Sequence, residues 1–173
     1  MSVNFLQAQI ASNILDYEIK FFIRNAGIEV DGTIGELAPE IKIDLNNPAN
    51  SSIKASAPIS TLNSGIKSRD EHLMKKDYFD QANYPTITFK SVSLKEGDGQ
   101  KWIGNFQVSI KGQTRSFAFP VTYRKDGDKL AIKGTFNLNR RDFGVGGGSI
   151  ILSDKVRVEL RATLAIEAEE GTG

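Results

Sequence analysis

The chain holds few side chains of the kinds that catalyse reactions or bind metals. It has 173 residues, one histidine (His72) and no cysteine. One imidazole cannot form a multi-histidine zinc site, and without cysteine there is neither a thiolate metal site nor a thiol nucleophile. The groups next to His72 that bind anions or move protons are Arg69, Asp70 and Glu71. We therefore expect no metal site, and any acid–base chemistry would depend on His72.

Arg69, Asp70 and His72 permit two interpretations. In the first, Arg69 and His72 contact the polar head of a ligand. In the second, Arg69 and Asp70 pair or cap locally and His72 binds backbone, so that the three residues lock a short helix in place. The second interpretation is favoured, because a short helix that packs on strands commonly needs such capping contacts to hold it in place.

A second polar group follows a long alternating run: Arg140, Arg141 and Asp142. An arginine grips a phosphate bidentately. The alternative is an ion pair at a strand end, from arginine to Asp70 or Asp142, and for Asp142 we favour this structural role. The glycines in 144–148 do not predict a phosphate-binding loop, because no Lys-Ser/Thr follows and the next expected element is a strand.

Alternation of apolar and polar residues dominates the chain and predicts strands. The clearest run is 155–167, and the other expected strands cover 15–24, 39–45, 52–60, 86–95, 101–110, 115–124 and 129–139. A phase change near Lys90 or Ser91 predicts a β-bulge. A weaker strand is expected near 3–9, and a second short helix or turn around 26–32.

Residues 64–82 break the alternation and predict a short helical excursion. We expect a helix at about 68–76, capped by Ser68, with Asp70 in its first turn. The expected fold class is therefore all-β, with eight antiparallel strands closed into a barrel, because closure removes exposed edges. We expect one domain over residues 1–167 and a short acidic tail over 168–173.

Four strings resemble the YceI-like family of lipocalin-like, polyisoprenoid-binding proteins. They are SRDEHLMKKDYFDQANYPTITFKS (68–91), GNFQVSIKGQTRSFAFPV (104–121), GTFNLNRRDFGVGG (134–147) and SDKVRVELRATLA (153–165). Their order and spacing match the family over roughly residues 14–166. One departure is Arg24-Asn25-Ala26-Gly27, where many members carry a His-Leu-Gly-like string.

The resemblance implies a long apolar tunnel that holds an isoprenoid or similar amphiphile, such as a quinone tail or fatty acyl derivative. The inward residues assigned to this tunnel are Phe21, Ile23, Ile59, Phe89, Trp102, Phe106, Phe117, Phe119, Tyr123, Phe136 and Leu160. The residues assigned to the head group or to a lid are Arg69, Asp70, His72, Phe79, Arg140, Arg141 and Phe143. From the residues alone, the aromatic side chains on the inward faces of the strands either pack a solid core or line a cavity.

The expected function is a lipid carrier or store without catalysis, holding a bound isoprenoid-type lipid and no other cofactor. The alternatives are a filled barrel that serves as an adaptor, and a lipid-modifying enzyme that uses His72. The formal net charge of +1 argues against nucleic acid as a partner. No run predicts a membrane span or a signal peptide, so the expected location is cytoplasmic, or periplasmic or secreted if a leader was removed. Monomer and homodimer both stay open.

Overall fold

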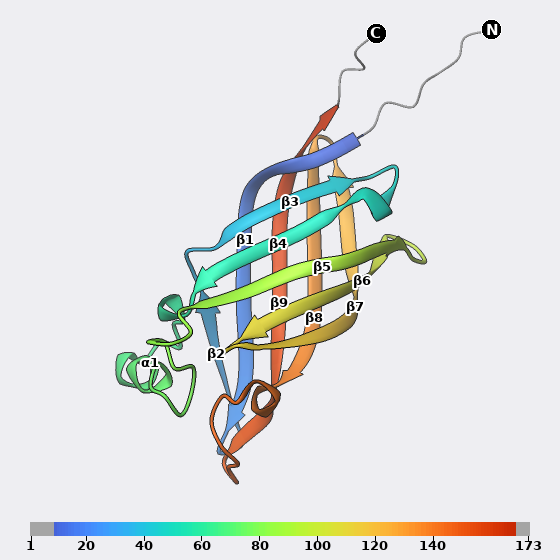
Figure 1. Ribbon diagram of the computed structural model, residues 1–173. Helices are drawn as coiled ribbons and strands as arrows, with labels where there is room; N and C mark the ends of the chain where they lie inside the picture. Colours follow the sequence, from blue (N-terminus) through green and yellow to red (C-terminus); the bar gives the residue numbers. More distant parts are fainter. Residues whose placement is uncertain (1–8, 169–173) are drawn as a thin grey trace, which may run out of the picture.

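The computed structural model describes residues 9–168, which form nine strands, one α-helix and three short 3-10 helices (Figure 1). The strands are β1 Gln9–Asn25, β2 Ile28–Ile34, β3 Ala38–Asp44, β4 Ser52–Pro58, β5 Thr86–Glu96, β6 Lys101–Ile110, β7 Gln113–Asp126, β8 Lys129–Asn139 and β9 Leu152–Ala168. The helices are α1 Lys67–Leu73, η1 Pro48–Asn50, η2 Ile59–Thr61 and η3 Arg140–Phe143. The strand expected near 3–9 and the tail 168–173 lie, apart from Gln9 and Ala168, outside the described residues.

The expected eight-stranded antiparallel barrel is confirmed. Each strand from β3 to β9 pairs with the next, and β1 closes the circle by pairing with both β9 and β3. The pairing of β1 with β9 runs from Gln9↔Ala168 to Asn25↔Leu152, whereas within the described residues β1 pairs with β3 at Ile10 and Ala11 alone. Figure 1 shows α1 and η3 at one end of the barrel and the first and last described residues at the other.

The ninth strand, β2, was not expected. The prediction of a helix or turn over 26–32 was wrong beyond its first two residues. Ala26 and Gly27 both have positive φ, 51° and 77°, and make a tight turn that returns the chain alongside β1. The outer part of β1 therefore has β2 as its neighbour, and β2 extends the wall beyond the closed barrel.

Helix α1 begins at Lys67, earlier than expected, and ends at Leu73. Ser68 is not its cap, which corrects the prediction, because the N-cap position is Ile66 and no side chain caps there. Asp70 instead accepts hydrogen bonds from the backbone N–H and the hydroxyl of Ser64, which lies before the helix. The bulge expected in β5 is confirmed by a register shift between Ser91 and Ser93.

One half of the barrel interior, towards the described chain ends, is filled with side chains. Trp102 stacks on Tyr123 with ring centroids 4.1 Å apart. Around them lie fully buried aliphatic residues, Ala11, Ile43, Leu94, Leu130 and Leu164. Next to this filled half, a row of stacked phenylalanines crosses the interior, made of Phe89, Phe106, Phe119 and Phe136. Open space lies on the other side of this row and at its edge.

Candidate ligand-binding site

The main cavity lies at the barrel end that carries α1 and η3. It measures about 200 Å³ and is partly enclosed. Its wall comes from β1, β2, β5, β6, β8 and β9, and α1, η3 and the segments beside them border it. The apolar lining includes Ile19, Phe21, Ile23, Val30, Ile34, Leu62, Leu73, Tyr78, Phe79, Ile87, Phe89, Val108, Ile110, Phe136, Leu138, Phe143, Val145, Leu152, Val156, Val158 and Leu160. Only four lining residues are polar, namely Asn25, Ser64, Arg69 and Arg140.

A second, smaller and more open cavity of about 80 Å³ lies on the other side of Phe89. It forms where β1 diverges from β3, and Tyr17, Leu37 and Pro39 contribute to its wall. The Tyr17 hydroxyl donates to the Leu37 carbonyl at 3.5 Å across this divergence, a long contact on an exposed ring. The linings of the two cavities share Ile19, Phe89 and Leu160. These three side chains therefore separate the two spaces.

The polar cluster at the edge of the main cavity is built around Ser64. The Arg69 Nε donates to the Ser64 hydroxyl at 2.8 Å, and its Nη2 donates to the Ser64 carbonyl at 2.6 Å. The Ser64 hydroxyl in turn donates to Asp70. Arg69 and Asp70 thus do not pair directly but hold the same serine from two sides. Within residues 9–168, the Arg69 Nη1 has no hydrogen-bond partner.

Arg140, in contrast, has a structural position. Only 4% of it is exposed, and it donates to the carbonyls of Val145, Leu152 and Ser153. Its Nη2 also lies 3.1 Å from Asp154 Oδ1 in an ion pair. The ion-pair partner expected for Arg140 was Asp70 or Asp142, and the structure corrects this to Asp154. The guanidinium therefore clamps both ends of the segment 145–153.

The comparisons with known proteins agree with this architecture. A family model described as the YceI-like domain matches residues 14–164. The chain belongs to the YceI-like family. A UPF0312 protein from Pseudomonas savastanoi is 26% identical over 153 residues, covering 82% of this chain and 80% of that protein.

Two solved structures share the YceI-like fold. The crystal structure of BcnA from Burkholderia cenocepacia superposes with a TM-score of 0.82 at 22% identity, covering 88% of this chain and 98% of that one. A polyisoprenoid-binding domain from Saccharophagus degradans gives a TM-score of 0.70 at 11% identity, covering 91% and 98% of the two chains. At these identities the two structures establish the fold.

The YceI-like barrel distributes the expected tunnel residues over three regions. Five of them line the main cavity: Phe21, Ile23, Phe89, Phe136 and Leu160. Phe106 and Phe119 line the second cavity. The remaining four, Ile59, Trp102, Phe117 and Tyr123, line neither. Trp102 and Tyr123 stack in the filled half, Phe117 packs against Phe136 and Phe143, and Ile59 lies buried in η2.

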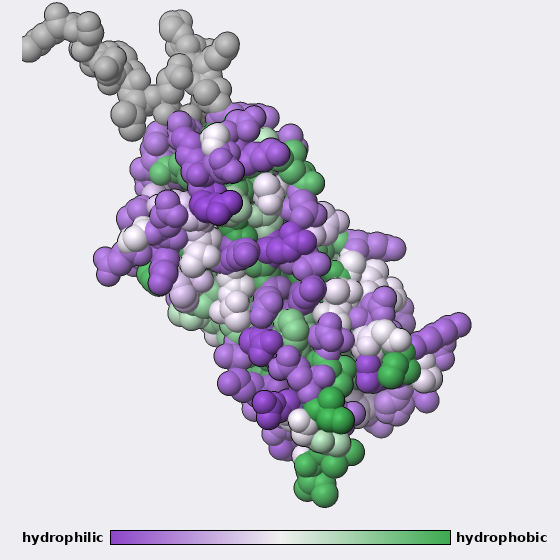
Figure 2. All heavy atoms as spheres, turned by 180° about the vertical axis from the view of Figure 1, so that it is seen from behind, coloured by the Kyte–Doolittle hydropathy of each residue, from purple (hydrophilic) through white to green (hydrophobic). Residues whose placement is uncertain are grey.

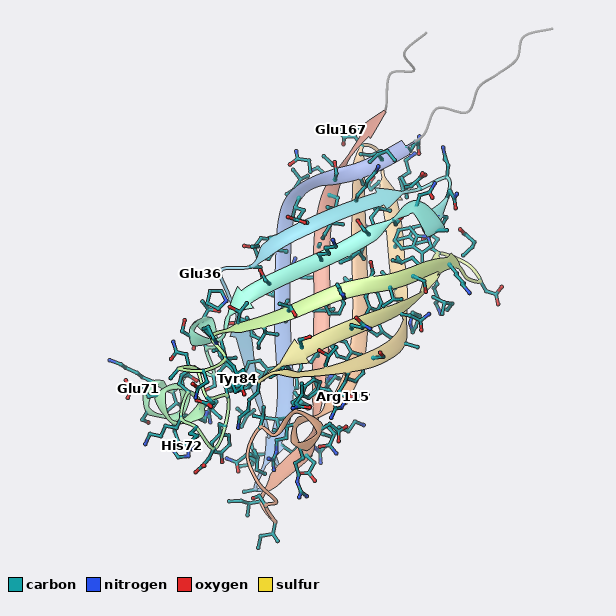
Figure 3. All side chains as sticks on the ribbon, viewed as in Figure 1. Glu36, Glu71, His72, Tyr84, Arg115 and Glu167 are labelled. Atoms are coloured by element: carbon teal, nitrogen blue, oxygen red, sulfur yellow. The ribbon has the colours of Figure 1, made fainter. Side chains whose placement is uncertain are left out.

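The residues expected at a head group or lid are divided in the same way. Arg69, Phe79, Arg140 and Phe143 line the main cavity. Asp70 reaches it only through Ser64, and Arg141 is about half exposed beside Asp154. His72 is exposed on α1, where its ring packs at 5.1 Å from that of Tyr78 (Figure 3). His72 therefore touches a lining residue but not the cavity.

Two polar lining residues were not assigned to the site from the sequence, Ser64 and Asn25. Ser64 gives no signal in the sequence, because its role depends on the fold of the segment before α1. Asn25 belongs to the string in which this chain departs from the His-Leu-Gly-like pattern of the resemblance. Its place at the end of β1, beside the turn 26–27, was the signal in the sequence. Among residues 9–168, no group of three or more metal-binding side chains is present, and no helix has the length and apolar character to cross a membrane.

Proposed function

We propose that this YceI-like barrel binds a long-chain isoprenoid or similar amphiphilic lipid and serves as a carrier or store. The observation that carries the proposal is the main cavity, apolar along its depth and polar only at a few positions near α1 and η3. Such a lining takes an apolar chain out of water, at about 25 cal/mol per Å² of apolar area. The name of the Saccharophagus domain, a polyisoprenoid-binding domain of the same fold, supports the same ligand class.

The dimensions of the two cavities support a ligand whose chain extends past Phe89. The main cavity of about 200 Å³ is smaller than typical small-molecule sites, which run from about 300 to 1,000 Å³. Phe89 lines both cavities and stacks on Phe106, with ring centroids 4.9 Å apart. Rotation of the Phe89 ring would join the two spaces. The chain end of the lipid would then enter the second cavity.

The head group would lie near Arg69. This guanidinium lines the main cavity and is held in place by two hydrogen bonds to Ser64, and its Nη1 has no hydrogen-bond partner within the described residues. A fixed guanidinium is well suited to a phosphate, a carboxylate or a carbonyl oxygen of a polar head. Arg140 gives less support for this role, because three carbonyls and Asp154 already engage its guanidinium.

The other two candidate functions gain less from the structure. A lipid-modifying enzyme needs His72 within reach of the ligand, whereas His72 is exposed and outside the cavity lining. A filled-barrel adaptor agrees with the packed half around Trp102 but leaves the apolar cavity beside α1 without a role. The lipid-binding proposal uses both halves, since the packed half forms the floor of the site.

Native mass spectrometry with lipid extraction tests the proposal. The expected result is one small amphiphile per chain, released on denaturation or taken up from polyprenyl phosphates, quinones or fatty acids. Val158→Phe, which adds a ring to the main cavity wall, should abolish uptake. Ile103→Phe makes the same kind of change at a side chain that is 45% exposed and should leave uptake unchanged. Absence of any bound amphiphile in the wild-type protein, or uptake by Val158→Phe, would overturn it.

A further inference from the structure

The barrel end that carries the main cavity also carries three exposed isoleucines. Ile150 is fully exposed, and Ile151 and Ile28 are 59% and 69% exposed. Ile28 follows the β1–β2 turn, and the Ala26 backbone N–H donates to the Ile151 carbonyl at 2.7 Å. This hydrogen bond joins the two loops into a single projection, here called the isoleucine tip (Ile28, Ile150 and Ile151). Figure 2 shows hydrophobic side chains gathered at this lower end of the molecule.

The isoleucine tip has a fixed base. Arg140 holds the carbonyls of Val145 and Leu152, which begin and end the loop that carries Ile150. The Gly146 backbone N–H also donates to the Asp77 carbonyl at 2.8 Å, which ties the loop to the segment after α1. A loop held at both ends exposes its apolar side chains at a defined place. The grouping of the three exposed isoleucines at one place points to a binding role, because contiguous exposed apolar patches mark interaction sites, whereas single exposed apolar residues do not.

The tip is continuous with the rim of the main cavity. Val145 and Leu152 at the two ends of the loop, and Asn25 just before the β1–β2 turn, all line that cavity. A surface that covers the tip would therefore stand next to the place where a ligand passes in or out. This position suits a partner that exchanges the ligand.

The composition and shape of the tip favour a lipid bilayer over a protein partner. Stable protein interfaces bury roughly 800 Å² on each side and depend on Trp, Tyr and Arg anchors. Three isoleucines on a narrow projection offer neither the area nor those anchors. A bilayer accepts a projecting apolar tip, because the side chains enter the boundary between head groups and acyl chains.

The charge beside the tip is compatible with the phosphates of a bilayer. The Arg141 guanidinium lies against the loop, with its Cζ 3.6 Å from the position that a β-carbon at Gly148 would occupy. The Arg141 side chain is half exposed, and its contact with Asp154 is a loose one of 3.7 Å. Arg24 is a second exposed cation, just before the β1–β2 turn. Basic residues at the membrane surface strengthen binding to anionic lipids.

We propose that the isoleucine tip docks onto a lipid bilayer and brings the cavity rim to the membrane surface. This inference rests on the proposed lipid-binding function, since it names the place where the ligand is collected or delivered. The chain would remain peripheral, with Ile150 and Ile151 in the interfacial layer. Arg141 would face the head-group phosphates.

The test is co-sedimentation with large unilamellar vesicles of phosphatidylcholine, with and without phosphatidylglycerol. The expected result is binding by the wild-type protein, stronger with phosphatidylglycerol. The double variant Ile150→Asp, Ile151→Asp should bind about tenfold less or weaker still, as the loss of two buried apolar side chains implies. Val92→Asp is the matched control, because Val92 is 62% exposed on the β5 bulge, and its binding should equal the wild type.

A second variant reports insertion directly. Ile150→Trp places an indole at the tip, and its emission should shift to the blue when vesicles are added, over the constant signal of the buried Trp102. Equal sedimentation of the double variant and the wild type, no sedimentation of either, or an unshifted Ile150→Trp spectrum would overturn the proposal. Dimerisation that the aspartates abolish would assign the tip to a second copy and overturn it too.

Native mass spectrometry of the same variants separates this proposal from the proposed function. The double variant should still hold or take up the amphiphile in solution, because neither isoleucine side chain lines the cavity. Loss of vesicle binding with ligand binding retained supports the docking role. Absence of ligand from every variant counts against the proposed function. Vesicle binding is measured in a separate experiment and decides only the docking proposal.

Discussion

The phenyl ring of Phe106 lies over Gly104, two residues earlier on the same face of β6. A β-carbon at Gly104 would stand 2.3 Å from the Phe106 Cε2, well inside van der Waals contact. In a similar way, the Phe119 ring on β7 covers Gly134 on the adjacent β8, with its Cε2 2.7 Å from the β-carbon position there. Glycines on the inward face of a strand would leave the lumen open if nothing covered them. In the structure these two glycines make room for rings that close the lumen.

Gly104→Ala should therefore destabilise the protein. The added methyl group meets a ring that stacks on both Phe89 and Phe119, so the whole row must shift. Overpacking of this kind costs about 1–3 kcal/mol, measured as the free energy of urea unfolding. Gly147→Ala is the control, because no atom lies within 4 Å of its β-carbon position, and it should change stability little. Equal stability of the two variants would contradict this account of the row.

Arg140 should contribute more to stability than its neighbour Arg141. Arg140→Gln leaves the carbonyls of Val145, Leu152 and Ser153 without their donor. Loss of a buried charged donor of this kind costs about 2–4 kcal/mol, which equilibrium unfolding measures. Arg141→Gln removes a half-exposed contact of 3.7 Å and should cost less than about 0.5 kcal/mol. A larger loss for Arg141→Gln would refute the clamp.

The pair of Asp16 and Arg161 predicts a pH dependence at the acid end. Arg161 Nη1 donates to Asp16 Oδ2 at 2.7 Å across β1 and β9, and this hydrogen bond, aided by the charge of Arg161, lowers the pKa of Asp16. A carboxyl whose pKa is lower in the folded state stabilises the fold above its unfolded pKa. That contribution is lost as the pH falls through the folded pKa.

Asp16→Asn should thus lower the melting temperature slightly at neutral pH. The difference from the wild type should shrink as the pH falls below about 4. The solvent-exposed position of the pair keeps the effect small and sensitive to salt. Asp98→Asn, in the exposed β5–β6 turn, serves as the comparison. A difference that grows towards low pH would have the wrong sign.

Phe89→Leu tests the partition between the two cavities. A smaller side chain at this shared position should connect them, so that the site retains longer ligands than the wild type does. A homologous series of fatty acids, in competition with a fluorescent fatty acid, measures the preferred chain length. Phe117→Leu is the control, since Phe117 lines neither cavity. An unchanged preference in Phe89→Leu would show that the ligand does not pass this ring.

Alternation in the sequence predicted the barrel well. β6 and β8 have the bounds expected from their alternating residues, 101–110 and 129–139. Alternation did not predict β2, because the inward positions of this strand include Gly32, which carries no apolar side chain. The ring of Phe21 covers Gly32, with Cζ 2.2 Å from the β-carbon position there. The signal that was present is Ala26-Gly27, a tight turn, followed by Ile28, Val30 and Ile34 in alternation.

The candidate site was less predictable than the fold. Alternation identifies which residues face inward, and Trp102 and Phe89 do so equally. It does not say which rings stack against each other and which border open space, because that depends on contacts between strands far apart in the sequence. Polar contacts between residues far apart in the sequence were unpredictable for the same reason. Arg140 reaches Asp154 across the loop 144–151, and no local spacing marks that ion pair.

The long ladder between β1 and β9 brings the first and last described residues together. Gln9 pairs with Ala168 at the end of the barrel opposite α1, η3 and the isoleucine tip. A circular permutant that joins these two ends with a short linker and opens the β6–β7 turn at Lys111 should keep the barrel closed. Fluorescent proteins, affinity tags or surface tethers joined directly to Gln9 or Ala168 would start from the end opposite the cavity rim. The molecule therefore offers one end for immobilisation while the other remains accessible.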